Sequence, residues 1–411
     1  PVSDINFRDY KLRTPMGKSI LPKKRDQHFN QFQFVSAMAP GWVFGLAIVD
    51  LNLVSNGFFY LFDFESGQMF EHSFLQPLAR NTNIEPYPER GYARFRKGDL
   101  SMAIEPATGV RNVRVSGPGN IRVDLELRDT EQPLRLVSPA GYNGWVFTRK
   151  SAGLTVDGEV RLGDVVWRCD ESTRGSIDWS CGFMRRETAW NWACLAGVAD
   201  NGVSVGLNLA AGVNETGMTE NALWLDGRRV LLGPARFEFD RYQPGADWRV
   251  TTDDGRVDLR FVPAGARREK LNAWVIASNF RQFVGTFQGT VADENGKKIP
   301  LPKNTPEVLK GTSLIGKPMG SGVVGEGKGT FIEDLYADKI IEFMTSNKEK
   351  PFFIYFASTV PHGGPPGGMR VPSLEGYDKL ENLTLHEQVY CALLTRHDRN
   401  VGRIREAVKK R

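Results

Sequence analysis

Alternation of apolar and polar side chains is the clearest pattern in this chain. Apolar residues recur at every second position along 203–209, 121–128 and 257–261. A period of two places successive side chains on opposite faces, so each stretch predicts a strand with two unlike faces. Asn-Gly and Asp-Gly dipeptides, which tolerate the positive φ of a tight hairpin, recur between such stretches. These dipeptides begin at Asp157, Asn201, Asp226, Asp254 and Asn295.

The same strand-and-turn pattern continues through most of residues 21–300, and no helical stripe interrupts it. Short strands joined by tight turns predict antiparallel sheets that close into barrels or stack as a sandwich. A region of about 280 residues is too long for one small barrel. We therefore predict a mainly β domain of two packed units over 21–300, preceded by an N-terminal extension over 1–20.

The pattern changes after residue 300. Residues 301–330 are rich in Gly, Pro and Lys and predict a linker. An apolar helical stripe follows at 332–344, and the continuous apolar run 351–358 predicts a buried strand. A capping box, Thr384 to Glu387, opens a last helix. We therefore expect 331–411 to be a short α/β segment.

Composition narrows the classes of partner. The 411 residues carry a formal net charge of +5, without the concentrated basic stripe that nucleic-acid binding requires. No apolar run approaches the roughly 18 residues of a membrane span. The N-terminus is polar and the four cysteines form no CxxC pair. We predict no nucleic-acid partner, no transmembrane segment and a cytoplasmic location.

Uncharged polar and indole side chains gather between residues 188 and 227. Such groups on strands are typical of a pocket that orients a mostly apolar ligand. They are equally compatible with a β core in which indole N–H groups and amides are simply hydrogen-bonded. The candidate ligand-binding residues are Trp190, Asn191, Trp192, Asn208, Asn214, Asn221 and Trp224.

Two carboxylates are candidates for catalysis. Glu220 lies among these polar groups, and Asp178 precedes Trp179. A carboxyl group against indoles is desolvated, its pKa rises, and it can act as a general acid, for example to protonate an alkene. Both carboxylates could instead make structural hydrogen bonds. The five histidines and four cysteines show no metal-ligand spacing, so we predict no metal site and no cofactor.

Several motifs are specific enough to indicate a family. They include GWVFGLAIVDLN (41–52), TAWNWA (188–193) and TGMTENALWLDG (216–227). In these motifs residues 20–300 resemble the family "domain of unknown function 2804". That family looks akin to the lipocalin-like group that contains carotenoid hydratases. The resemblance implies two lipocalin-like units, but a fold does not determine a function.

The C-terminal segment resembles the middle of a sulfatase along 334–362, 371–380 and 398–410. By position, His362 matches the histidine at the substrate sulfate. The nucleophile motif C/S-x-P-x-R is absent, because Phe183 stands where the proline is required between Cys181 and Arg185. The resemblance therefore implies a truncated sulfatase-like segment with His362 as a remnant of the sulfate site. An unpaired apolar strand in this segment could mediate self-association.

Three functions follow from these observations. The first is a β-barrel protein that binds an apolar or amphipathic small molecule, such as a lipid or isoprenoid. The second is an acid-catalysed hydratase or isomerase that uses Glu220 or Asp178 in the same pocket. The third is a sulfuric ester hydrolase, against which the missing nucleophile and metal motifs argue. The sequence does not decide whether the protein is an enzyme.

Overall fold

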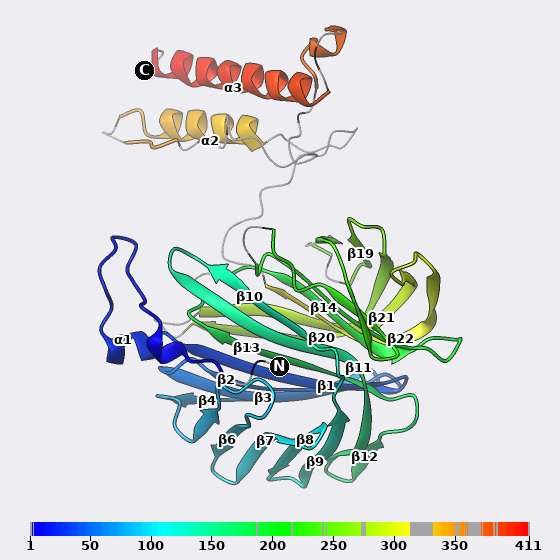
Figure 1. The fold of residues 1–411 in the computed structure, drawn as a ribbon. Helices are drawn as coiled ribbons and strands as arrows, with labels where there is room; N and C mark the ends of the chain where they lie inside the picture. Colours follow the sequence, from blue (N-terminus) through cyan, green and yellow to red (C-terminus); the bar gives the residue numbers. More distant parts are fainter. Residues whose placement is uncertain are drawn as a thin grey trace. The chain divides into compact units, whose positions relative to one another are not determined.

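The computed structural model divides the chain into two compact units, Pro1–Leu314 and Ile315–Arg411. It describes residues 2, 4–185, 188–214, 217–240, 242–243, 245–272, 277–312, 332–349, 353–356, 358, 360, 371, 373–380, 383 and 385–409. The first unit is built from two antiparallel sheets, and Figure 1 shows how their strands curl.

The first sheet follows two short helices, η1 (Phe7–Asp9) and α1 (Pro22–Asp26). Its thirteen described strands are β1 (Asn30–Ala39), β2 (Trp42–Asp50), β3 (Val54–Asp63), β4 (Gln68–Pro77), β5 (Thr82–Ile84), β6 (Ala93–Lys97), β7 (Leu100–Ala107), β8 (Val110–Gly117), β9 (Ile121–Arg128), β10 (Leu134–Ala140), β11 (Gly144–Leu162), β12 (Val165–Arg168) and β13 (Arg174–Gly182). They pair in the order β4-β3-β2-β1-β13-β11-β9-β8-β7-β6-β5, and β10 and β12 also pair with β11.

The second sheet has nine described strands in the order β17-β16-β15-β14-β22-β21-β20-β19-β18. They are β14 (Asn191–Val198), β15 (Ser204–Ala211), β16 (Ala222–Leu225), β17 (Arg228–Leu231), β18 (Ala235–Glu238), β19 (Trp248–Thr252), β20 (Val257–Asn272), β21 (Ala277–Ala292) and β22 (Lys298–Thr312). The predicted strands at 121–128, 203–209 and 257–261 correspond to β9, β15 and the start of β20. The prediction of a mainly β region built from antiparallel sheets is therefore confirmed.

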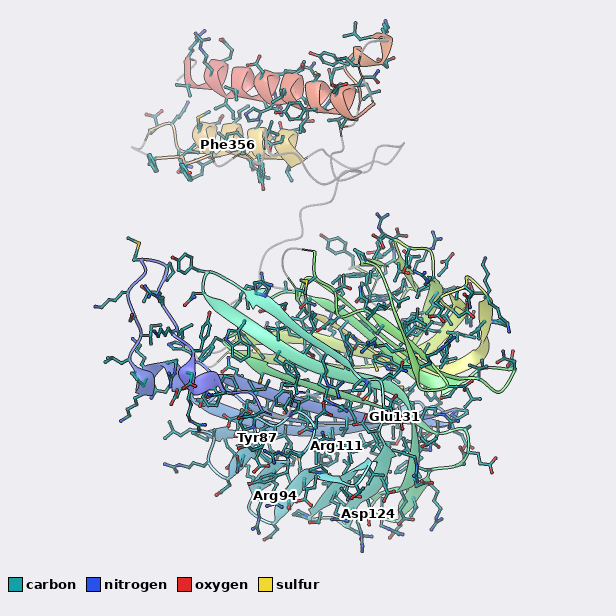
Figure 2. All side chains as sticks on the ribbon, viewed as in Figure 1. Tyr87, Arg94, Arg111, Asp124, Glu131 and Phe356 are labelled. Carbon is teal, nitrogen blue, oxygen red and sulfur yellow. The ribbon has the colours of Figure 1, made fainter. Side chains whose placement is uncertain are left out.

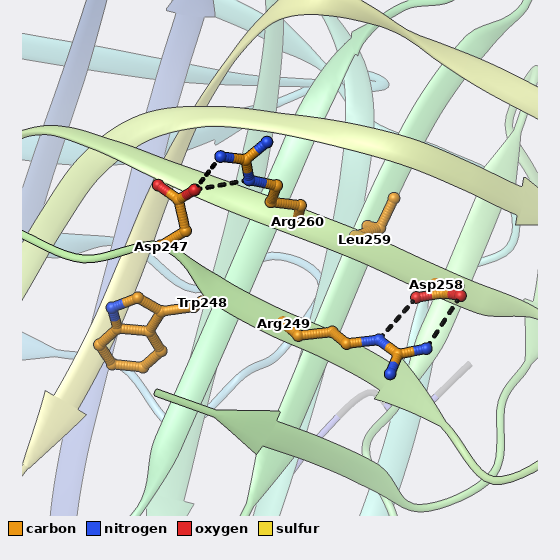
Figure 3. A pocket seen from close by; sticks show the side chains of 6 residues that line it. All are labelled: Asp247, Trp248, Arg249, Asp258, Leu259 and Arg260. Atoms are coloured by element: carbon orange, nitrogen blue, oxygen red, sulfur yellow. Dashed lines mark hydrogen bonds and ion pairs between the residues drawn. The ribbon is translucent and has the colours of Figure 1, made fainter. Parts of the chain in front are cut away.

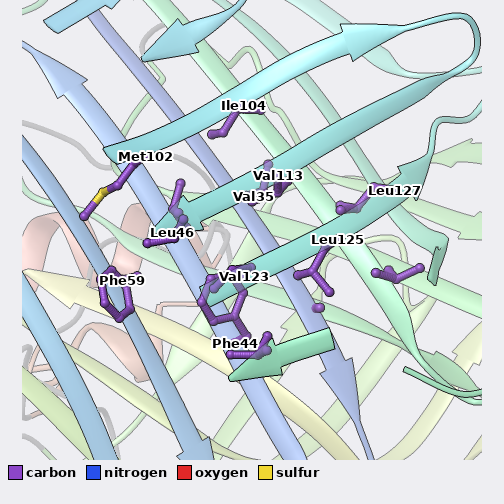
Figure 4. Packing of buried hydrophobic residues seen from close by; sticks show 14 of the residues in the cluster. Val35, Phe44, Leu46, Phe59, Met102, Ile104, Val113, Val123, Leu125 and Leu127 are labelled. Carbon is purple, nitrogen blue, oxygen red and sulfur yellow. The ribbon is translucent and has the colours of Figure 1, made fainter. Parts of the chain in front are cut away.

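Successive side chains of one strand point to opposite faces and pack into two different hydrophobic cores. On β1, Val35 and Ala37 belong to the core inside the first curled sheet, whereas Phe34 and Met38 pack between the two sheets. Figure 4 shows the first core, in which residues of β7, β8 and β9 face those of β1, β2 and β3. The second sheet encloses its own core of residues such as Leu207. Three apolar layers therefore hold the first unit together.

The two sheets touch most closely at a pair of glycines. Gly153 lies at a bulge of β11 with φ +77°, and Gly206 lies on β15 of the second sheet. A Cβ at Gly206 would be 2.2 Å from the backbone carbonyl carbon of Ala152. Only a glycine allows this approach of backbone to backbone.

We expect Gly206→Ala to lower the free energy of unfolding by about 1–3 kcal/mol, because the added methyl group forces the two sheets apart. Urea unfolding followed by tryptophan fluorescence measures the change. Gly41→Ala is the control, because a Cβ at Gly41 meets nothing within 4 Å. Equal stability of the two variants would contradict the close packing at Gly206.

The N-terminal segment closes one end of the first sheet. Phe7 stacks on Phe29 with ring centroids 3.7 Å apart, and both belong to a cluster with Phe147, Trp179 and Phe183. These aromatic contacts hold the segment before β1 against β11 and β13.

The second unit contains α2 (Ile332–Ser346), η2 (Tyr377–Lys379) and α3 (Leu385–Lys409). Arg396 of α3 binds Asp334 of α2 and Glu375, with its Nη1 3.0 Å from the Glu375 carboxylate. Both predicted helices are therefore confirmed. No helix in the described ranges is long and apolar enough to cross a membrane.

Two local predictions were wrong. Asp157-Gly158 is not a hairpin but lies within β11, where Gly158 faces Leu125. A Cβ there would be 2.0 Å from the carbonyl oxygen of Asp124, so the glycine is required by the neighbouring strand. The predicted buried strand at 351–358 is not observed at 353–356, where no described strand pairs with it and Phe353 is exposed.

The domain boundaries remain predictions, with one adjustment. β22 continues to Thr312, so the first part of the predicted linker 301–330 belongs to a strand. Residues 313–331 and His362 lie outside the described residues.

Candidate functional site: a buried lysine between two carboxylates

Lys150 lies opposite Asp178 on neighbouring strands of the first sheet. The register of β11 and β13 pairs these two residues directly, so both side chains project toward the second sheet. Lys150 Nζ donates a hydrogen bond of 2.7 Å to Asp178 Oδ2. Because both side chains are largely removed from solvent, this ion pair belongs to the space between the sheets.

Glu220 reaches the same lysine from the second sheet. It lies two residues before β16, and its Oε1 is 3.3 Å from Lys150 Nζ. The side chains of Lys150 and Glu220 are each only 5% exposed. One buried ammonium group therefore contacts two carboxylates that are 42 positions apart in the chain.

Burial and neighbouring charges determine the pKa values of Glu220 and Lys150 in this cluster of Lys150, Asp178 and Glu220. Burial raises the pKa of Glu220, the charge of Lys150 opposes this effect, and the charge of Asp178 adds to it. Burial alone would lower the pKa of Lys150, but Asp178 and Glu220 together raise it above its ordinary value. Lys150 therefore stays charged, and Glu220 is the member that can hold a proton nearest to neutral pH.

Uncharged groups predicted from the sequence surround the cluster. Asn214 donates a hydrogen bond to the Glu220 carboxylate and accepts one of 2.9 Å from Ser138. Trp192 Nε1 donates to Asn208 Oδ1 at 2.8 Å, and Asn208 Nδ2 donates to the backbone oxygen of Glu220 at 2.7 Å. The Lys150 ammonium lies 6.0 Å from the centroid of the Trp192 ring. Asn208, Asn214 and Trp192 thus help to position Glu220 and Lys150.

Asn221 and Trp224, two further predicted ligand-binding residues, form hydrogen bonds with the backbone. Asn221 Oδ1 accepts a hydrogen bond from the Ala210 backbone N–H, and its Nδ2 donates to the backbone oxygen of Gly233. Trp224 Nε1 donates to the backbone oxygen of Gln132. These bonds hold the fold together. Half-buried Trp190 packs at the edge of the core between the sheets, and Asn191 begins β14. A ligand contact for all seven predicted residues stays a prediction.

Lys150 was not predicted from the sequence. The stretch 147–152 of β11 reads Phe-Thr-Arg-Lys-Ser-Ala, and its two neighbouring charged residues give no local sign that Lys150 is buried. Charged side chains are rarely buried unless they are paired, so a lysine that the fold buries requires buried partners. Those partners come from β13 and from the loop before β16, which the local sequence does not reveal.

The surface hollows of the first unit have a different chemistry. Figure 3 shows a hollow of about 290 Å³ on β19 and β20, lined by the exposed ion pairs Arg249–Asp258 and Arg260–Asp247. A second hollow of about 530 Å³ lies at residues 128–132, 153–155, 204 and 226–228. Exposed ion pairs are well solvated and contribute little to stability, so the first hollow is a weaker candidate for chemistry than the buried cluster.

Metal ligands do not cluster in the part of the chain that the structure describes. No group of three or more His, Cys, Asp or Glu residues is placed to hold a metal ion there. The expected absence of a metal and of a cofactor stays a prediction.

The raised pKa of Glu220 predicts a pH-dependent stability. The ordinary pKa of a glutamate is 4.5. Above that pH the folded protein retains a proton on Glu220 that the unfolded chain has lost. Stability must then fall as the pH rises through that window. We expect Glu220→Gln to abolish this fall, which urea unfolding at a series of pH values between roughly 4.5 and 7.5 would measure. Parallel stability curves for wild type and variant would contradict a raised pKa.

The two curled antiparallel sheets define a mainly β protein. The chain belongs to the family described as Domain of unknown function (DUF2804), whose model matches residues 11–305. No curated protein matches the chain in sequence.

Solved structures with a similar fold share little sequence with this chain. A structure of CghA with Sch210972 is 9% identical, with a TM-score of 0.51 over 76% of this chain and 95% of that chain. Kievitone hydratase from Nectria haematococca is 10% identical, with a TM-score of 0.44 over 68% of this chain and 88% of that chain. The similarity to the CghA structure concerns the fold alone, and none of these comparisons supports the sulfatase resemblance of the C-terminal segment.

Proposed function

We propose that this protein binds a mostly apolar small molecule between its two sheets and that Glu220 transfers a proton to it, as in an alkene hydratase or isomerase. The carboxyl group of Glu220 carries the proposal. It is buried, its pKa is raised, and it is held by Lys150 and Asn214. Binding alone needs no such group, because an apolar ligand is held by apolar contacts and a few neutral polar groups.

The surroundings of Glu220 suit an apolar ligand that carries a reactive double bond. Trp192 and Phe34 pack edge to face at 5.8 Å in the core between the sheets. Aromatic faces attract positive charge, which develops on an alkene carbon as it is protonated. Apolar walls beside a proton donor therefore favour the alkene substrates proposed here.

The chemical steps follow from the cluster. The π electrons of the alkene form a C–H bond with the Glu220 proton and leave a carbocation. Lys150 then stabilises the resulting Glu220 carboxylate. In a hydratase, water adds its oxygen to the cation and returns a proton to Glu220, for a net addition of H₂O. In an isomerase, Glu220 or Asp178 removes a proton from a neighbouring carbon instead.

Deuterium labelling tests this proposal across several classes of unsaturated compound. The protein is incubated in D₂O with a panel of isoprenoid alcohols, unsaturated ketones and prenylated phenols, and products are analysed by mass spectrometry. A product that is heavier than its substrate by one D₂O indicates hydration. A product that has only exchanged single hydrogen atoms for deuterium indicates isomerisation. We expect Glu220→Gln to convert the same compound at least about 100-fold more slowly, because general acid catalysis typically contributes 10²–10⁴-fold.

Glu131→Gln is the matched control, because Glu131 is exposed on the loop after β9. It should convert the compound at the wild-type rate. Unchanged turnover by Glu220→Gln, or a wild-type protein that labels no member of the panel, would refute the proposal.

A further inference from the structure

Two glutamines on β1 present unpaired amide atoms inside the first curled sheet. Gln33 is 1% exposed, and neither its Oε1 nor its Nε2 has a hydrogen-bond partner in the protein. Gln31 lies on the same face, and its Oε1 is likewise buried and unpaired. Among the described residues, three of the four such side-chain atoms belong to these two glutamines.

The register of β1 shows where the amides point. Gln33 pairs with Ile48 of β2 and Trp179 of β13. Ile48 belongs to the core inside the first sheet, so Gln33 faces that interior, away from the core between the sheets that contains Phe34. The glutamines therefore form a site separate from the Lys150 cluster.

A loop anchored by buried hydrogen bonds lies beside this site. Gln31 Nε2 donates to the backbone oxygen of Ile84 at 2.8 Å. Arg111 donates to the backbone oxygens of Pro88 at 2.7 Å and Gly91 at 2.9 Å. Figure 2 labels Arg111 of β8 and Tyr87 of this loop. Residues 84–91 are thus held at the end of the barrel where the glutamines lie.

The charged side chain in the row of the glutamines already has hydrogen-bond partners. Arg149 lies in the same row beyond Trp179, and each of its nitrogen atoms donates to Glu89, Ser151 or Asp129. An anionic ligand would gain little binding free energy from this arginine, because its nitrogen atoms already have partners. A cationic ligand would be repelled by its positive charge. The amide atoms instead require a neutral partner that both donates and accepts hydrogen bonds.

We propose that Gln31 and Gln33 bind a small neutral molecule with hydroxyl or carboxamide groups inside the first barrel. A buried amide atom without a partner costs folding free energy, and an apolar residue at position 33 would avoid that cost. Binding of such a molecule would give partners to the three amide atoms that have none in the protein.

Thermal unfolding with small neutral probes tests the proposal. Glycerol, xylitol and acetamide are each added at roughly 10 mM, well below the concentrations at which polyols act as excluded osmolytes. We expect at least one probe to raise the Tm of the wild-type protein by about 2–4 °C and to leave that of Gln33→Leu unchanged. Native mass spectrometry of the freshly purified proteins should likewise show a bound neutral mass only when Gln33 is present.

The controls separate this site from other causes. Gln243→Leu removes an exposed glutamine and should keep the response to the probe, as should Glu220→Gln, which alters only the cluster between the sheets. Should Gln33→Leu fail to fold, Gln31→Met provides the same comparison. Equal responses of wild type and Gln33→Leu would overturn the proposal. So would a wild-type protein without any response or bound mass, because ordered water alone would then satisfy the glutamines.

Discussion

Replacing Lys150 by methionine is expected to lower the free energy of unfolding by about 3–5 kcal/mol, the usual effect of removing one partner from a buried ion pair. The substitution keeps the length of the side chain but leaves the buried Asp178 carboxylate and the Glu220 carboxyl group without a counter-charge. Burial of this uncompensated negative charge then opposes folding. Urea unfolding at neutral pH measures the loss.

Two comparisons show that charge, and not packing, causes this loss. The triple variant Lys150→Met, Asp178→Asn, Glu220→Gln removes the uncompensated charges and should recover most of the stability. Arg249→Met breaks an exposed pair with Asp258 and should cost less than about 1 kcal/mol. A triple variant no more stable than Lys150→Met would show that the ammonium group is not held by charge.

Trp224→Ala is expected to cost about 3–5 kcal/mol, as for other large-to-small changes at buried aromatic residues. The indole is fully buried in the core between the sheets. Its Nε1 also donates a hydrogen bond of 3.0 Å to the backbone oxygen of Gln132, on the segment that joins β9 and β10. The variant therefore loses both packing volume and a link between the two sheets. Urea unfolding measures the change.

Trp224→Phe separates these two contributions. Phenylalanine retains most of the apolar contact but cannot donate to Gln132, so its cost should be clearly smaller than that of alanine. Equal losses for the two variants would show that the hydrogen bond, not packing, accounts for the role of Trp224.

The secondary structure was predictable where a local pattern has one physical solution. The alternation at 121–128 can bury only one face, and it forms β9. Asn201-Gly202 and Asp226-Gly227 both form tight turns with positive φ at the glycine. Asp157-Gly158 carries the same signal but lies within β11, because a neighbouring strand, not a turn, requires that glycine.

The candidate site was predictable only in part. Glu220 and Asp178 were chosen because each lies near indoles in the sequence, and the structure brings both to one ammonium group. Lys150 was missed because its role depends on the register of β11 with β13 and on the approach of the second sheet. The glutamines of β1 were missed for the same reason, since only the folded structure shows that they are buried.

The sequence by itself determined the mainly β class, its antiparallel sheets and a change of character near residue 300, because strand periodicity and turn chemistry are local properties. Only the tertiary structure decided which polar side chains are buried together. Residues 150, 178 and 220 come from three separate segments, and the pKa values of Lys150 and Glu220 depend on burial and on the charges around them. No pattern within one segment contains that information, because desolvation and Coulomb interactions act through space.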